Sequence, residues 1–90
     1  MIRRDIEIVN KLGLHARAAS KLVALTGRFS ATITLGRTGQ KPVDAKSIMA
    51  MLMLAANKGT VLVLECDGSD EQEAADAVCA LVTDFFGEGE

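Results

Sequence analysis

The only histidine of the chain, His15, follows a glycine-containing turn and precedes an alanine-rich run. Gly13 can adopt backbone angles that are closed to other residues, and the residues after His15 favour a helix, so the chain should change from turn to helix here. The amides of Ala16, Arg17 and Ala18 would then lack intrahelical acceptors at the positive end of the helix dipole, where Arg17 adds a cation. A nitrogen nucleophile beside such an anion-binding position indicates phosphoryl transfer through histidine.

The alternative is that His15 only starts a helix or lies on the surface, which is the commoner role of a lone histidine. Against this, the run GLHAR at residues 13–17 resembles the active-site motif of the HPr family, the histidine phosphocarriers of bacterial phosphotransferase systems. Residues 45–49 (AKSIM) resemble the second motif of that family. Residues 58–60 (KGT) resemble the stretch before its last strand, and residues 70–74 (DEQEA) resemble the start of its last helix. In length and element order the resemblance covers essentially the whole chain.

Length and composition predict one domain, residues 1–90, with a modest core. The chain is 49% hydrophobic but has only three phenylalanines as aromatic residues, so aliphatic side chains, alanine and methionine must fill the core. No large internal cavity is expected. Ten basic and twelve acidic residues give a net charge of −2, which argues against nucleic-acid binding. No set of metal ligands is visible, and no cofactor is expected.

The start of the chain lacks the apolar run of a signal peptide, and no stretch approaches the ~20 apolar residues of a membrane span. We therefore expect a cytoplasmic protein without membrane insertion. Cys66 and Cys79 have neither zinc-ligand spacing nor the spacing of a redox pair, so we expect both to be reduced and mainly structural.

Apolar periodicity predicts the elements of secondary structure. Alternation predicts strands over residues 2–8, 30–35, 40–43 and 60–67, with a hairpin turn at residues 36–39. Helical spacing predicts helices over residues 16–26, 48–54 and 70–86. The order β-α-β-β-α-β-α favours an α+β fold with helices packed on one face of an antiparallel sheet. The HPr resemblance implies an open-faced β-sandwich, with a four-stranded antiparallel sheet, three helices and the other face open.

Several element ends have local signals. Gly27 is a candidate left-handed stop for the first helix. Ser69 and Gln72 are predicted to form a capping box at the start of the last helix, and Phe85 is placed on its core-facing stripe. Residues 87–90 are expected to be a frayed acidic tail.

The resemblance implies a role for each residue around His15. His15 would attack through Nδ1, receive the phosphoryl group from the phosphohistidine of Enzyme I, which is charged by phosphoenolpyruvate, and hand it to downstream acceptors of the EIIA type. The amides of Ala16–Ala18 and the Arg17 guanidinium can stabilise the transferring group by position and charge. Arg17 could instead be a solvated helix residue. We expect a monomeric carrier rather than a stand-alone enzyme.

The helix predicted over residues 48–54 is too apolar to be wholly buried. Ile48, Met49 and Leu52 share one side of it, and methionine-rich apolar surface suits docking to several partners. The resemblance places this patch, together with Ser20, next to His15 as the docking surface for Enzyme I and acceptor proteins. The alternatives are core packing and an oligomer contact.

Ser47 has two possible roles. It is a favourable N-cap for the helix over residues 48–54. In many HPr proteins the matching serine is also phosphorylated by a dedicated kinase, the HPr kinase/phosphorylase. A phosphate there would put negative charge inside the docking patch and repel acidic partners.

The chain departs from the family at Ala18, where members often have proline. Alanine keeps helix propensity and adds one amide donor, so activity should survive. This form also occurs in the nitrogen-related branch, NPr, and in proteobacterial HPr proteins, so sugar uptake and nitrogen-related regulation both remain open. A hydrolase of the acylphosphatase type would need a glycine-rich phosphate loop where His15 stands, and a purely regulatory binding domain would make His15 dispensable.

Overall fold

The computed structural model describes residues 1–89 and has the predicted order of elements. The elements are β1 (Ile2–Glu7), α1 (Ala16–Thr26), β2 (Thr32–Arg37), β3 (Val43–Asp44), α2 (Ile48–Met53), β4 (Val61–Asp67), α3 (Glu71–Thr83) and a short 3₁₀ helix, η1 (Phe85–Gly87). The predicted span of the first helix is confirmed at both ends.

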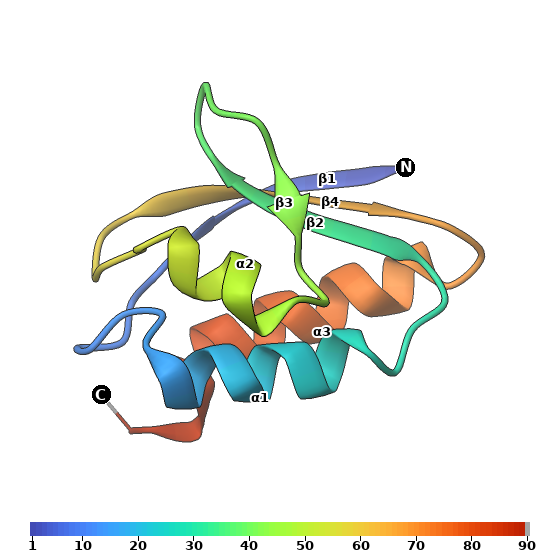
Figure 1. The fold of residues 1–90 in the computed structure, drawn as a ribbon. Coiled ribbons are helices and arrows are strands. Elements are labelled where there is room, and N and C mark those ends of the chain that lie inside the picture. Colours follow the sequence, from blue (N-terminus) through green and yellow to red (C-terminus); the bar gives the residue numbers. More distant parts are fainter. Residues whose placement is uncertain (90) are drawn as a thin grey trace.

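The strands form one antiparallel sheet in the order β1-β4-β2-β3. All three α-helices lie on the same side of this sheet, and no helix of the described residues covers its other side (Figure 1). The α+β open-faced sandwich is therefore confirmed.

The core lies between the sheet and the helices. On β4, Leu62, Leu64 and Cys66 are fully buried, whereas the alternate residues of this strand lie on the open face. On α1, Ala18 and Ala19 are also fully buried, because small side chains let the helix approach the sheet closely.

The β2–β3 hairpin lies later in the chain than predicted. β2 ends at Arg37 instead of residue 35, because Gly36 pairs with Val63 of β4 and does not start the turn. β3 contains only Val43 and Asp44. The preceding Pro42 has no amide hydrogen with which to extend the ladder.

Two predicted helix signals are wrong. Gly27 has a right-handed φ of −64°, so α1 ends without a left-handed residue. The capping box of Ser69 and Gln72 does not form, and Asp70 is the N-cap residue of α3. Its carboxylate accepts hydrogen bonds from the amides of Ser30 and Ala31, both at 2.8 Å, and these bonds hold the pKa of Asp70 below its usual value.

The chain after α3 differs most from the prediction. α3 ends at Thr83, because Phe85 and Phe86 take positive φ values of 56° and 52° and turn the chain back. Phe86, not Phe85, fills the core and is fully buried. The expected frayed tail is wrong for Gly87 and Glu88, because both amides bond within the C-terminal turn and the Glu88 side chain makes hydrogen bonds described below. Glu90 lies outside the described residues.

Both cysteines are free thiols, as predicted. Burial raises the pKa of the Cys66 thiol. Cys79 is half-buried and accepts a weak hydrogen bond from Arg4, which also pairs with Asp76 at 2.9 Å. In residues 1–89, no helix is long and apolar enough to cross a membrane.

Candidate functional site

His15 is the N-cap residue of α1. Its backbone is extended (φ −82°, ψ −179°), and the first hydrogen bond of the helix runs from the Ala19 amide to the His15 carbonyl at 2.8 Å. The amides of residues 16–18 precede that bond and point out of the positive end of the helix. The side chain of His15 is 27% exposed, so a group on another protein can reach it.

The turn before His15 depends on Gly13. Its φ is +69°, and a Cβ added there would lie 2.5 Å from the carbonyl oxygen of Ala56. The next residue, Leu14, donates its amide to that same oxygen at 2.8 Å. The turn therefore packs against the chain that leaves α2, an approach that only glycine permits.

The imidazole of His15 is bonded to the end of the chain. Its Nε2 lies 2.5 Å from Oε2 of Glu88. The other oxygen of Glu88 accepts a hydrogen bond of 2.9 Å from the side-chain amide of Asn10. Burial alone would raise the pKa of the Glu88 carboxyl, but the hydrogen bonds from Asn10 and His15, together with the charge of Lys21, hold it below its usual value. Glu88 is therefore a carboxylate that is only 10% exposed and lies beside the imidazole of His15.

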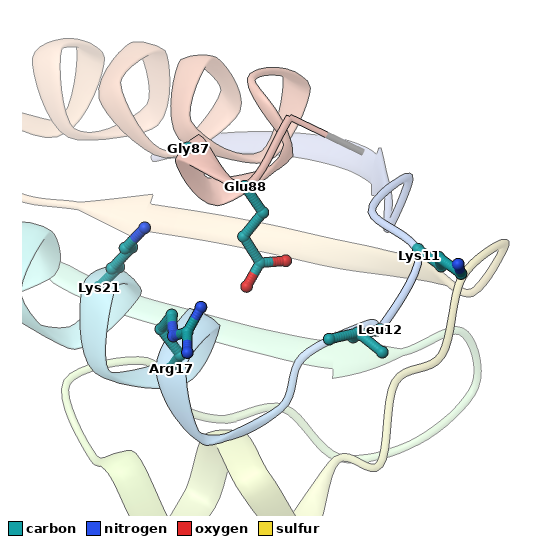
Figure 2. A pocket seen from close by; sticks show the side chains of 6 residues that line it. All are labelled: Lys11, Leu12, Arg17, Lys21, Gly87 and Glu88. Atoms are coloured by element: carbon teal, nitrogen blue, oxygen red, sulfur yellow. The ribbon is translucent and has the colours of Figure 1, made fainter.

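A surface pocket of about 340 Å³ opens next to this pair. Figure 2 shows the Glu88 carboxylate pointing into it from the C-terminal segment, opposite Arg17 at the start of α1. Its lining includes Lys11, Leu12, Arg17, Lys21, Gly87 and Glu88. Three cations against one carboxylate give the pocket a positive charge that would attract a phosphoryl group or an acidic partner.

Comparison with known proteins decides the family. A family model described as "PTS HPr component phosphorylation site" matches residues 2–84. The chain belongs to the HPr family. The resemblance seen in the motifs is thus confirmed, and the protein is a phosphocarrier of a phosphotransferase system.

Individual HPr relatives agree in length and in structure. The phosphocarrier protein HPr of Cupriavidus necator is 56% identical over the full length of both chains. The phosphocarrier protein NPr of Shewanella violacea is 45% identical over 97% of this chain and 94% of its own. A crystal structure of HPr-C-His from Thermoanaerobacter tengcongensis has a TM-score of 0.93 at 42% identity and covers 98% of each chain. Neither the sequence nor the structure comparison favours a hydrolase.

The predicted docking residues of this HPr chain lie on α1 and α2. Ser20 is exposed on α1. On α2, Ile48, Met49 and Leu52 are 44%, 67% and 36% exposed, whereas Met51 is fully buried and holds the helix to the core. Ile48, Met49 and Leu52 are therefore not among the buried residues of the core. The two helices contact each other, as Figure 1 also shows.

Ser47 is the N-cap residue of α2, as predicted. Its hydroxyl accepts a hydrogen bond of 3.2 Å from the amide of Ala50. The side chain is half-buried, and its hydroxyl is already used within the fold.

Sequence reasoning missed four polar residues at this HPr site. Asn10 and Glu88 bond to the His15 turn or to its imidazole, and Lys11 and Lys21 line the pocket. One signal was available in the sequence. Two adjacent aromatic residues lie close to the end of the chain, and large aromatic side chains need burial. Their burial would hold the neighbouring residues against the rest of the fold. Within residues 1–89, no group of three or more His, Cys, Asp or Glu side chains could hold a metal ion.

Proposed function

We propose that His15 accepts a phosphoryl group on Nδ1 from phosphorylated Enzyme I and passes it to acceptor proteins of the EIIA type. The observation that supports this most directly is the position of the imidazole. It stands at the start of α1, and its Nε2 lies within hydrogen-bond distance of the Glu88 carboxylate, which can only accept. A neutral ring that donates from Nε2 to this acceptor keeps its free lone pair on Nδ1. No other side chain in the sequence is an imidazole.

The chemistry asks little of the protein beyond position and charge. The lone pair of Nδ1 forms a bond to phosphorus while the bond between phosphorus and the donor nitrogen breaks. Phosphoryl transfer has a loose transition state, so amide donors and cations at the transferring group supply most of the stabilisation. The amides of Ala16, Arg17 and Ala18 and the side chain of Arg17 fit this role. Donor and acceptor are separate proteins, so the chain acts as a carrier and not as a stand-alone enzyme.

The exposed apolar side of α2 is the proposed docking surface for both partners. Ile48, Met49 and Leu52 offer adaptable apolar contacts, and Ser20 on α1 adds a polar one. The cations of the neighbouring pocket would favour acidic partners. We expect the chain to act as a monomer.

Ser47 is a proposed second phosphorylation site, for the HPr kinase/phosphorylase. The modification would replace a capping hydroxyl beside the docking surface with a dianion. Incubation with this kinase and labelled ATP, with Ser47→Ala as the control, tests the proposal. Absence of label on the wild type would contradict it.

Acid-labile phosphorylation tests the main proposal. Wild type and His15→Ala are each mixed with Enzyme I and phosphoenolpyruvate, after circular dichroism has shown that both are folded. Label on the wild type alone is expected, whereas label on His15→Ala would place the acceptor elsewhere. Repeating the reaction with Enzyme I of the sugar system and with its nitrogen-related counterpart distinguishes the HPr branch from the NPr branch by rate.

A further inference from the structure

The C-terminal segment, residues 85–88, is fixed to α1. The buried side chain of Phe86 anchors it in the core, and Lys21 of α1 donates a hydrogen bond of 2.8 Å to the Phe86 carbonyl. The Glu88 amide donates to the Phe85 carbonyl at 2.9 Å. These contacts direct the Glu88 side chain towards His15.

Asn10 connects this segment to the turn before His15. Its side-chain nitrogen donates to the Gly13 carbonyl at 2.7 Å and to the Glu88 carboxylate at 2.9 Å. Both partners are acceptors only, so the orientation of the amide is determined. Asn10 is fully buried, so its bonds to the turn and to Glu88 do not compete with water.

We propose that Glu88 is a positioning residue for phosphoryl transfer, which accepts a hydrogen bond from Nε2–H of His15 and thereby keeps the reacting lone pair on Nδ1. The inference rests on the proposed role of His15 as the acceptor. Glu88 lies in the C-terminal segment, beyond residues 2–84, which are the part of the chain that the family model matches.

The same hydrogen bond acts on the charge that forms during transfer. As the Nδ1–phosphorus bond forms, the bond to the donor breaks and its electron pair returns to the donor nitrogen. The proton stays on Nε2, so the imidazole ring gains positive charge. The Glu88 carboxylate faces that proton and stabilises the charged ring, as the aspartate of a catalytic triad does for its imidazolium. When the phosphoryl group leaves for the acceptor protein, the ring returns to its neutral form.

The experiment compares wild type with Glu88→Gln, which keeps the size of the side chain and removes its charge, and with Glu88→Asp, which keeps the charge. Glu73→Gln is the matched control, because Glu73 is exposed on α3 and the substitution makes the same change in net charge. The first readout is the ¹⁵N NMR spectrum of the His15 ring in the unphosphorylated proteins at neutral pH. The second is the rate of phosphoryl transfer from phosphorylated Enzyme I.

We expect wild type and Glu73→Gln to show a protonated Nε2 and an unprotonated Nδ1. In Glu88→Gln the two nitrogen signals should move towards those of exchanging tautomers. The maximal transfer rate should fall about tenfold with little change in the half-saturating concentration, and Glu88→Asp should recover part of the rate. The backbone spectrum of Glu88→Gln should stay the same as that of the wild type. If Glu88 had only a structural role, the ring signals would not change under that condition.

Identical ring signals in wild type and Glu88→Gln, or transfer rates within about twofold of each other, would overturn the inference. The other failure is that the ring signals differ between wild type and Glu88→Gln but Enzyme I does not phosphorylate the wild type. That result would instead refute the acceptor role of His15. The two failures are thus distinguishable.

Discussion

Replacing Gly13 with alanine should destabilise the fold and disturb the site together. The added Cβ would lie 2.5 Å from the Ala56 carbonyl oxygen and 2.9 Å from Cα of Asn57, so the two segments must separate by about 1 Å to restore ordinary contact. That movement breaks the hydrogen bond of 2.8 Å from Leu14 to Ala56 and leaves buried polar groups unpaired, at about 1–3 kcal/mol. The positive φ of Gly13, +69°, adds about 1 kcal/mol for any residue with a Cβ.

Gly39 provides the matched control for this change. Its φ is +81°, but a Cβ added there would meet nothing within 4 Å. Gly39→Ala should therefore cost about 1 kcal/mol from backbone strain alone, against about 2–4 kcal/mol for Gly13→Ala. Urea unfolding followed by circular dichroism measures both free energies, and thermal midpoints should differ by several degrees, at about 4–8 °C per kcal/mol. Gly13→Ala should also accept phosphoryl groups more slowly, because the turn that positions His15 is displaced. Equal stabilities for the two variants would refute the role assigned to the close approach.

Three further changes test the docking surface, the α2 cap and the C-terminal segment. Met49 is 67% exposed, so Met49→Glu should slow phosphoryl transfer from Enzyme I about tenfold at unchanged stability. The control Val61→Glu, on the open face of the sheet, should not slow it. Equal transfer rates for the two variants would contradict the docking role. Ser47→Ala removes the acceptor for the Ala50 amide and should lower the unfolding free energy by about 1 kcal/mol. Urea titration measures this change, and an unchanged unfolding midpoint would argue against the cap. The pKa of Glu88 is lowered in the folded protein, so its contribution to stability is present above the unfolded carboxyl pKa and is lost as pH falls through the folded pKa. Thermal melts of wild type and Glu88→Gln should differ at neutral pH and converge as the pH falls through the lowered pKa of Glu88, and a difference that persists in strong acid would contradict this.

Local signals in the sequence were sufficient for the order of the elements and for the start of α1. Gly13 and the alanine-rich run define the change from turn to helix, and the alternation along β4 defines both faces of the sheet. Both signals rest on a few consecutive residues and on periods that backbone geometry imposes. The helix over residues 48–54 was predicted with its exposed side because a single short helix cannot bury so many apolar residues.

Predictions failed where a distant residue supplied the partner. The capping box at Ser69 was a valid local pattern, but Asp70 is the N-cap residue, and its carboxylate bonds the amides of Ser30 and Ala31, about forty positions earlier. The hairpin moved because Gly36 gains a place in the ladder beside β4, which outweighs its preference for a turn. Tertiary contacts decide between such local alternatives.

The end of the chain shows the same limit at the site itself. Two glycines and two glutamates in residues 87–90 resemble a flexible end by local propensity, and the partner of Glu88 lies 73 positions away. The proposed chemistry implies a hydrogen-bond acceptor near His15. A half-buried imidazole that reacts through Nδ1 carries its hydrogen on Nε2, and this N–H group needs an acceptor. The sequence offers twelve acidic residues for that purpose, and in the described part of the chain the burial of Phe86 brings Glu88 to His15. The proposed acceptor histidine could thus be recognised from its immediate neighbours, whereas the position of the residue proposed to orient it depends on how a hydrophobic side chain at the far end of the chain packs.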